Sequence, residues 1–224
     1  METISKKVVI LGLRDVLVPF DVVDSVPKNN LLEILKNLSQ LENEGKIKLF
    51  LVSGMKREEA GKKLSENSLS GFFRGENIRG ATPEYICKRE IIDQKRYEEA
   101  IRKDPFFCDE YLKVQVVQSL ISEGIFEDEI VYFGHDLMHD AFYLNRYCNV
   151  DTALVRQSLS FNNKKAEPIK GLIYADLTWP EFKKVIYGER KAESYEFLKA
   201  RVFSEIKEQL FGGDLVKKIT LTRK

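Results

Sequence analysis

Short apolar runs alternate with longer amphipathic segments along this chain of 224 residues. Apolar runs that are bounded by polar residues predict buried strands. We expect them at 7–11, 46–52, 129–133, 152–155 and 172–175, with a short edge strand at 71–73. Apolar residues at helical spacing predict helices at 27–44, 56–66, 110–123, 140–147 and 179–187. This alternation predicts an α/β fold with a doubly wound, mostly parallel sheet.

The length suits one core domain, which we place at residues 1–188. Residues 75–110 exceed a simple connection, so a small helical insertion is predicted there. It either carries Arg79, Tyr85, Lys88 and Arg89 near the mouth of a site or is a surface excursion without ligand contact. A C-terminal extension, residues 189–224, carries apolar residues three and four apart over 192–211, which predicts an amphipathic helix. Its apolar stripe either packs on its own domain or forms a homodimer contact, and both interpretations stay open.

Composition narrows the functional classes. A hydrophobic content of 43% supplies a core, and a formal net charge of +1 gives no field that would attract nucleic acid or an anionic membrane. No apolar run approaches the roughly 20 residues of a membrane span. The first residues run directly into the first strand, so we expect no secretory signal. Three scattered cysteines without a Cys-x-x-Cys pair favour a reducing, cytoplasmic setting.

Residues 7–18 resemble the first motif of the haloacid dehalogenase-like (HAD) superfamily, an apolar strand that ends in Asp-x-Asp-Gly-(Thr/Val)-Leu. Without gaps, the nucleophilic Asp of the family falls on Gly12, the acid/base Asp on Arg14 and the Gly on Asp15. The resemblance implies a Rossmann-like phosphotransferase scaffold of HAD type that lacks its nucleophile. A shifted register that moves Asp15 into the nucleophile position loses the match at 16–18.

Two further segments follow in the order of that family. Its second motif is a strand ending in Ser or Thr, usually before Gly, and Ser53 and Gly54 match it. A hydroxyl and backbone N–H groups at a strand end that leads into a helix can hold phosphate oxygens. The simpler reading is that Ser53 caps the helix that follows. The third motif is a Lys that offsets phosphoryl charge, and Lys113 is the candidate, although it could equally be a solvated helix residue.

Residues 130–140 resemble the fourth motif, a strand followed by Gly-Asp-Asp-x-x-x-Asp, with His135 in place of the first Asp. Asp136 and Asp140 are retained. In the family this acidic cluster helps to hold magnesium, and an imidazole there weakens the site and favours transition metals. We therefore expect no required cofactor. A weakly bound magnesium or transition-metal ion at His135, Asp136 and Asp140, or one that also uses His139, stays open.

These replacements turn an acidic phosphotransferase centre neutral to basic. Arg14 cannot act as an acid or base near neutral pH. Together with Lys113 it can replace a metal cation electrostatically and bind an anion. The leading hypothesis is a catalytically degenerate pseudo-phosphatase that binds a phosphorylated or otherwise anionic small ligand, or a protein partner, without turnover. Its predicted anion-binding residues are Ser53, Gly54, Lys113 and Arg14.

Two other hypotheses stay open. One is an active, metal-dependent HAD-type hydrolase that uses displaced carboxylates such as Asp15, Asp136 and Asp140. The other is a structural subunit whose amphipathic C-terminal helix makes the contact. Whether the chain is an enzyme is therefore undecided from the sequence.

Overall fold

The computed structural model describes residues 3–13, 16–18, 28–80, 102, 108–136, 140–141, 143–155, 172–175 and 177–190. Several predictions concern residues outside this set: the roles of Arg14, Asp15 and His139, the helical insertion, and the C-terminal helix. Among the described helices, none has the length and apolar character needed to cross a membrane.

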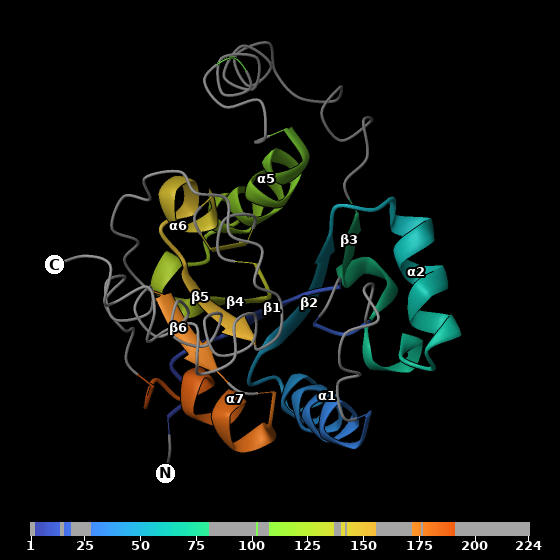
Figure 1. Ribbon diagram of the computed structural model, residues 1–224. Coiled ribbons are helices and arrows are strands. Elements are labelled where there is room, and N and C mark those ends of the chain that lie inside the picture. The colour runs from blue at the N-terminus through green and yellow to red at the C-terminus, as the bar shows by residue number, and fades with distance from the viewer. Residues whose placement is uncertain are drawn as a thin grey trace, which may run out of the picture.

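A six-stranded sheet forms the centre of the molecule, in the order β3-β2-β1-β4-β5-β6 (Figure 1). All neighbouring strands are parallel. The chain starts in the middle at β1, winds outward to β3, and then returns to β4 on the other side of β1. The prediction of a doubly wound parallel sheet is confirmed. The strands are β1 Val8–Gly12, β2 Lys48–Ser53, β3 Ile78–Gly80, β4 Ile130–Gly134, β5 Asp151–Val155 and β6 Leu172–Ala175.

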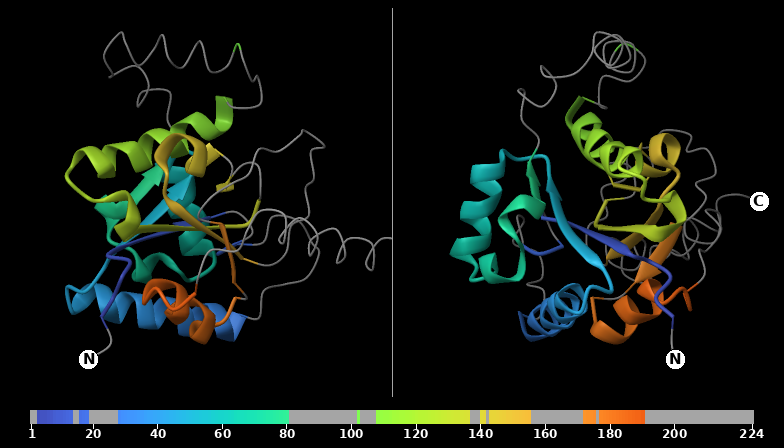
Figure 2. Two further views of the ribbon diagram at one scale, coloured as in Figure 1. Left: turned by 90° about the vertical axis from the view of Figure 1, so that its left-hand side faces the viewer. Right: turned by 180° about the vertical axis from the view of Figure 1, so that it is seen from behind.

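Helices cover both faces of this sheet, as the side view makes clear (Figure 2). On one face lie α1 (Lys28–Asn43), α2 (Arg57–Glu66) and α7 (Trp179–Ile186). On the other lie α5 (Cys108–Ser122) and α6 (Tyr143–Cys148). Each face has its own apolar cluster, and residues of β1 alternate between the two. Burial on both faces explains why the strands read as continuous apolar runs.

The edge strand predicted at 71–73 is wrong. That segment forms a 3₁₀ turn, η1 (Ser70–Phe72), followed by the buried Phe73. Phe72 and Phe73 pack on the apolar cluster of the α1 face, so the aromatic pair belongs to the core without strand pairing. The edge strand is β3, which follows a second 3₁₀ turn, η2 (Gly75–Asn77). The predicted insertion covers residues 75–110, and elements of the core overlap both of its ends. β3 extends to Gly80, and α5 begins at Cys108.

Candidate functional site

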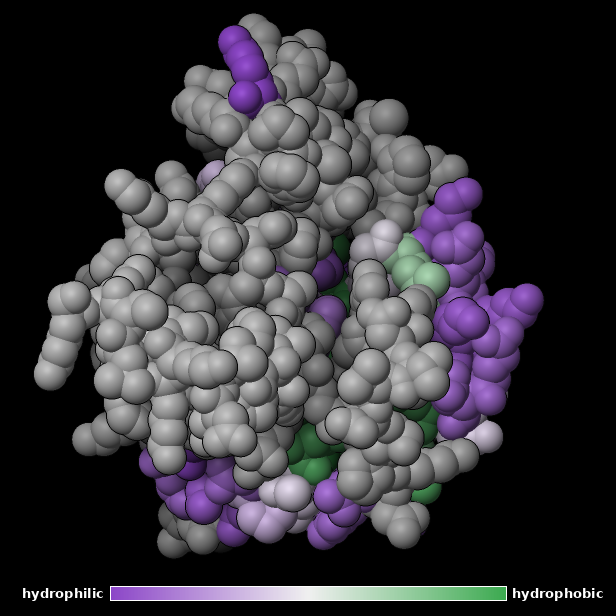
Figure 3. All heavy atoms as spheres, in the orientation of Figure 1, coloured by the Kyte–Doolittle hydropathy of each residue, from purple (hydrophilic) through white to green (hydrophobic). Residues whose placement is uncertain are grey.

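The described motif residues lie at the carboxyl edge of the sheet. Gly12 ends β1, Ser53 ends β2 and Gly134 ends β4. Because β1 pairs in parallel with both neighbours, these ends lie side by side. Doubly wound sheets bind their ligands at the carboxyl edge, beside the strand from which the chain winds first one way and then the other. In this sheet that strand is β1. The space-filling view, in the orientation of Figure 1, shows both hydrophilic and hydrophobic side chains near the middle of the molecule (Figure 3).

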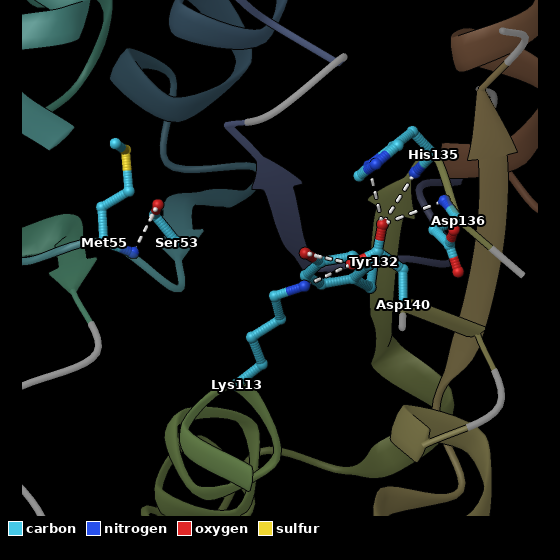
Figure 4. A network of polar contacts seen from close by, with 7 residues as sticks. All are labelled: Ser53, Met55, Lys113, Tyr132, His135, Asp136 and Asp140. Carbon is cyan, nitrogen blue, oxygen red and sulfur yellow. Dashed lines mark hydrogen bonds and ion pairs between the residues drawn. The ribbon is translucent and has the colours of Figure 1, made fainter. Parts of the chain in front are cut away.

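Asp140 is the centre of a hydrogen-bond network beyond the end of β4 (Figure 4). Its Oδ1 accepts from Lys113 Nζ at 2.8 Å and from the Tyr132 hydroxyl at 3.2 Å. Its Oδ2 accepts from the backbone N–H groups of His135 at 2.8 Å and Asp136 at 3.2 Å. Nδ1 of His135 lies 3.1 Å from the same oxygen. Asp140 is only 1% exposed, so these contacts are made away from water.

Local backbone geometry brings Asp140 into this position. The N–H of Asp140 donates to the carbonyl of Asp136 at 3.0 Å, which turns the chain back over the end of β4. Gly134 makes room for the returning side chain. A Cβ on Gly134 would lie 2.5 Å from the Cβ of Asp140 and 2.7 Å from its Oδ2. Any larger residue at this position would displace the carboxylate.

The charge of Asp140 is balanced within the protein. Burial by itself raises the pKa of this carboxyl group. The Lys113 ammonium, with the hydrogen bond and charge of His135, outweighs burial and holds the pKa of Asp140 well below its usual range. Asp140 is thus a carboxylate at neutral pH and forms a buried ion pair with Lys113. The family resemblance implies that the charge of Lys113 is directed at a phosphoryl group. In this structure Asp140 already balances that charge.

Tyr132 fills the space beside Gly12. It lies on β4 opposite Ile10, is fully buried, and donates its hydroxyl proton to Asp140. A Cβ on Gly12 would lie 3.0 Å from Tyr132 Oη and 3.4 Å from the carbonyl oxygen of Phe133. The position to which the resemblance assigns the nucleophile therefore has no side chain and little room for one. The sequence reasoning missed Tyr132, although a buried tyrosine hydroxyl needs a polar partner, and that need was the available signal.

Ser53 and Gly54 lie at the end of β2, across the close-up from the Asp140 network (Figure 4). Ser53 is 6% exposed, and its Oγ accepts from the N–H of Met55 at 3.1 Å. The N-cap of α2 is Lys56, without a side-chain cap, so the reading of Ser53 as a helix cap is wrong. The Ser53 hydroxyl proton remains able to donate, because no acceptor for it occurs in the described part of the chain.

The magnesium site of the fold family can be tested against these contacts. Magnesium needs about six oxygen ligands in octahedral geometry. Gly12 offers no side chain, and both oxygens of Asp140 already accept hydrogen bonds, one of them from an ammonium group. Within the described ranges, no group of three or more His, Cys, Asp or Glu side chains is placed to hold a metal ion. The described residues do not fit magnesium, and a metal at His135, Asp136 and Asp140 stays a prediction that the contacts of Asp140 oppose.

Comparisons with known proteins concern the fold. No protein-family model and no curated protein sequence matches the chain. A 4-nitrophenylphosphatase structure from Thermotoga maritima matches with a TM-score of 0.50 and 12% identity, over 81% of this chain and 98% of that one. A haloacid dehalogenase-like hydrolase from Bacillus subtilis matches with a TM-score of 0.48 and 11% identity, over 85% and 90% of the two chains. The chain has the HAD-type fold that its motifs predict.

Proposed function

We propose that this chain is a HAD-fold protein that binds a phosphorylated ligand, or a chemically similar anion, and does not hydrolyse it. The observation that carries the proposal is the position of the Tyr132 hydroxyl beside Gly12. The nucleophile position of the fold has no side chain, and the hydroxyl of Tyr132 stands 3.0 Å from where one would begin. The fold is shared with a phosphatase. Binding without hydrolysis is the part that we add.

The chemistry that remains at the site favours binding over turnover. HAD-type phosphoryl transfer, as the resemblance implies it, begins with attack by a carboxylate on phosphorus. Gly12 cannot attack, and Tyr132 is buried with its proton donated to Asp140. The positive charge beside Asp140 comes from the Lys113 ammonium at 2.8 Å. A lysine supplies charge but no bound water or open coordination position.

Groups at the end of β2 support anion binding. Ser53 presents a hydroxyl whose oxygen already accepts one N–H, so its proton can be donated outward. Gly54 follows in an open turn, where a Cβ would meet no atom within 4 Å. Backbone N–H groups in such a turn before a helix are suited to phosphate oxygens. Arg14, which follows β1 in the sequence, is the proposed additional cation.

Phosphorus NMR of phenyl phosphate mixed with the full chain tests binding and turnover in one sample. We expect a protein-dependent shift or broadening of the ester resonance and no growth of the inorganic phosphate resonance. Ser53→Ala should weaken binding by roughly 2- to 12-fold, the value of one hydrogen bond of about 0.5–1.5 kcal/mol. Ser65→Ala is the matched control, because the Ser65 hydroxyl donates to Gly61 on the exposed surface of α2.

Steady release of inorganic phosphate would contradict the proposal. Release that requires a divalent metal and is lost in Asp136→Asn would favour the hydrolase with displaced carboxylates. A complete lack of ester binding would remove the anion-binding half of the proposal and leave only the lack of turnover.

A further inference from the structure

Two large apolar side chains are exposed at the amino edge of the sheet, the edge opposite the candidate site. Phe126 is 71% exposed and Tyr147 is 41% exposed. Phe126 comes just before β4, and Tyr147 lies in the last turn of α6, just before β5. Because these two strands are parallel, the segments that enter them lie at the same edge. The remaining large apolar side chains of the described ranges are buried or half-buried.

Contacts between α5 and α6 join the two side chains into one surface. The helices lie side by side (Figure 1 and Figure 2), and the Gln118 side chain of α5 donates to the Tyr147 carbonyl at 3.1 Å. Val131 stands opposite Asp151 in the sheet, so the turns that carry Phe126 and Tyr147 are neighbours. We define the α5–α6 patch as Phe126 and Tyr147 with two half-buried residues that pack against the apolar cluster of this face, Ile121 and Ile125.

The end of α7 lies near this patch. The N–H of Lys6 donates to the carbonyl of Ile186, the last residue of α7, at 2.9 Å. The Nζ of Lys6 donates to the carbonyl of Asp128, two residues after Phe126, at 2.6 Å. One lysine therefore connects the end of α7 to the turn that carries Phe126. The last described residue, Arg190, donates its N–H back to α7 at 3.0 Å, so the chain continues from this same edge.

We propose that the C-terminal segment of the same chain, residues 192–211, packs as an amphipathic helix on the α5–α6 patch. The proposal is independent of the proposed function. The apolar positions of this segment recur three and four residues apart, at Tyr195, Leu198, Val202 and Ile206. Two exposed side chains are too few for a stable dimer, which buries about 800 Å² on each partner. A segment of the same chain needs less area, because its tether keeps its effective concentration high.

The charges of the segment and of the patch are complementary. Exposed acidic residues border the patch, at Glu123, Glu127 and Asp128. In the predicted helix Lys199 shares the apolar face, because it lies four residues after Tyr195 and three before Val202. A lysine at this position keeps its methylene groups on the apolar surface and directs its charge to the acidic border.

Hydrogen exchange of the full chain tests the contact. We expect the amides of residues 196–208 to be protected in the wild type. Phe126→Asp should speed their exchange by roughly tenfold or more, because it places a charge in the patch. Phe126→Leu should keep the protection. The matched control is Ser65→Asp, which adds the same charge on the exposed surface of α2, on the other face of the sheet. It should change the exchange less than twofold.

A variant in the segment itself supplies the reciprocal test. Leu198→Asp should speed the same amides as much as Phe126→Asp does, and the double variant should exchange no faster than either single variant. Amides of β1, in the middle of the sheet, serve as the reference for folding and should stay protected in every variant. Sedimentation of the same samples should give a monomer.

Three results would overturn the proposal. Protection that Phe126→Asp leaves unchanged would mean that the segment packs elsewhere. Protection that is present in a dimer and is lost as the protein is diluted to monomer would assign the patch to a second copy of the chain. Rapid exchange of residues 196–208 in the folded wild type would mean that the segment does not dock.

Discussion

The hydroxyl of Tyr132 lies 3.0 Å from the point where a side chain on Gly12 would begin, and it is hydrogen-bonded to Asp140. One side chain thus links a position where the resemblance expects a carboxylate with a carboxylate that the chain retains. Tyr132 fills the space beside Gly12 at the end of β1. It also supplies a donor to Asp140 beyond β4, beside Lys113. Gly12, Tyr132 and Asp140 therefore form one packed arrangement.

Adding a methyl group at Gly12 should be destabilising because of Tyr132. The Tyr132 ring is fully buried and cannot move aside easily, so Gly12→Ala should lower the free energy of unfolding by about 1–2 kcal/mol. Tyr132→Phe removes the hydroxyl and should cost about 1 kcal/mol for the lost hydrogen bond. The double variant should cost less than the sum by about 1 kcal/mol in urea denaturation. Strict additivity would mean that the two residues do not compete for space.

Removing the charge of Asp140 should be costly at neutral pH. Asp140→Asn leaves the Lys113 ammonium, which is only 12% exposed, without its carboxylate. We expect a loss of about 3 kcal/mol in the free energy of unfolding at pH 7. Lys113→Met should cost a similar amount, and the double variant much less than the sum. A double-mutant cycle that shows no coupling would contradict the ion pair.

The same carboxylate predicts a pH dependence. The pKa of Asp140 is lower in the folded protein than the value of about 3.9 expected in the unfolded chain. Its contribution to stability is therefore complete above about pH 4 and is lost as the pH falls from there toward the folded-state pKa. The stability difference between wild type and Asp140→Asn should shrink over that acid range. A difference that stays constant from pH 7 to below pH 3 would count against a depressed pKa.

Gly134 should tolerate no side chain. A Cβ there would lie 2.5 Å from the Cβ of Asp140, so Gly134→Ala should push the carboxylate out of its network and cost about 3 kcal/mol. Gly61 in α2 provides the matched control, because a Cβ there meets no atom within 4 Å. Gly61→Ala should be neutral or stabilising by up to about 1 kcal/mol, as expected for a helix interior. Equal effects of the two changes in thermal unfolding would refute the close approach.

The sheet could be predicted wherever burial on both faces leaves a continuous apolar run, as in β1, β2 and β4. The short edge strand β3 could not. It has three residues, contains Arg79 and ends in glycine, and only its pairing with β2 makes it a strand. The aromatic pair Phe72 and Phe73 misled the prediction, because packing on the core and strand pairing leave the same apolar signature.

Individual residues of the candidate site could be predicted from the sequence, but the contacts between them could not. Gly12, Ser53, Lys113 and Asp140 were each identified from motif spacing. The pairing of Lys113 with Asp140 joins residues 27 positions apart and depends on how α5 lies over the sheet. Tyr132 acts through the register of β4 against β1, which the sequence does not specify. The roles assigned to individual residues stay predictions until they are measured.

The most direct test of the central claim is the steady-state hydrolysis of 4-nitrophenyl phosphate by the folded chain with magnesium, manganese or zinc. Ser53→Ala serves as the control, because it removes a proposed phosphate contact and leaves the Asp140 network intact. The account predicts no turnover above buffer with any of the three metals. Metal-dependent turnover that is reduced in Ser53→Ala would contradict it, and would mean that a group other than residue 12 attacks the phosphorus.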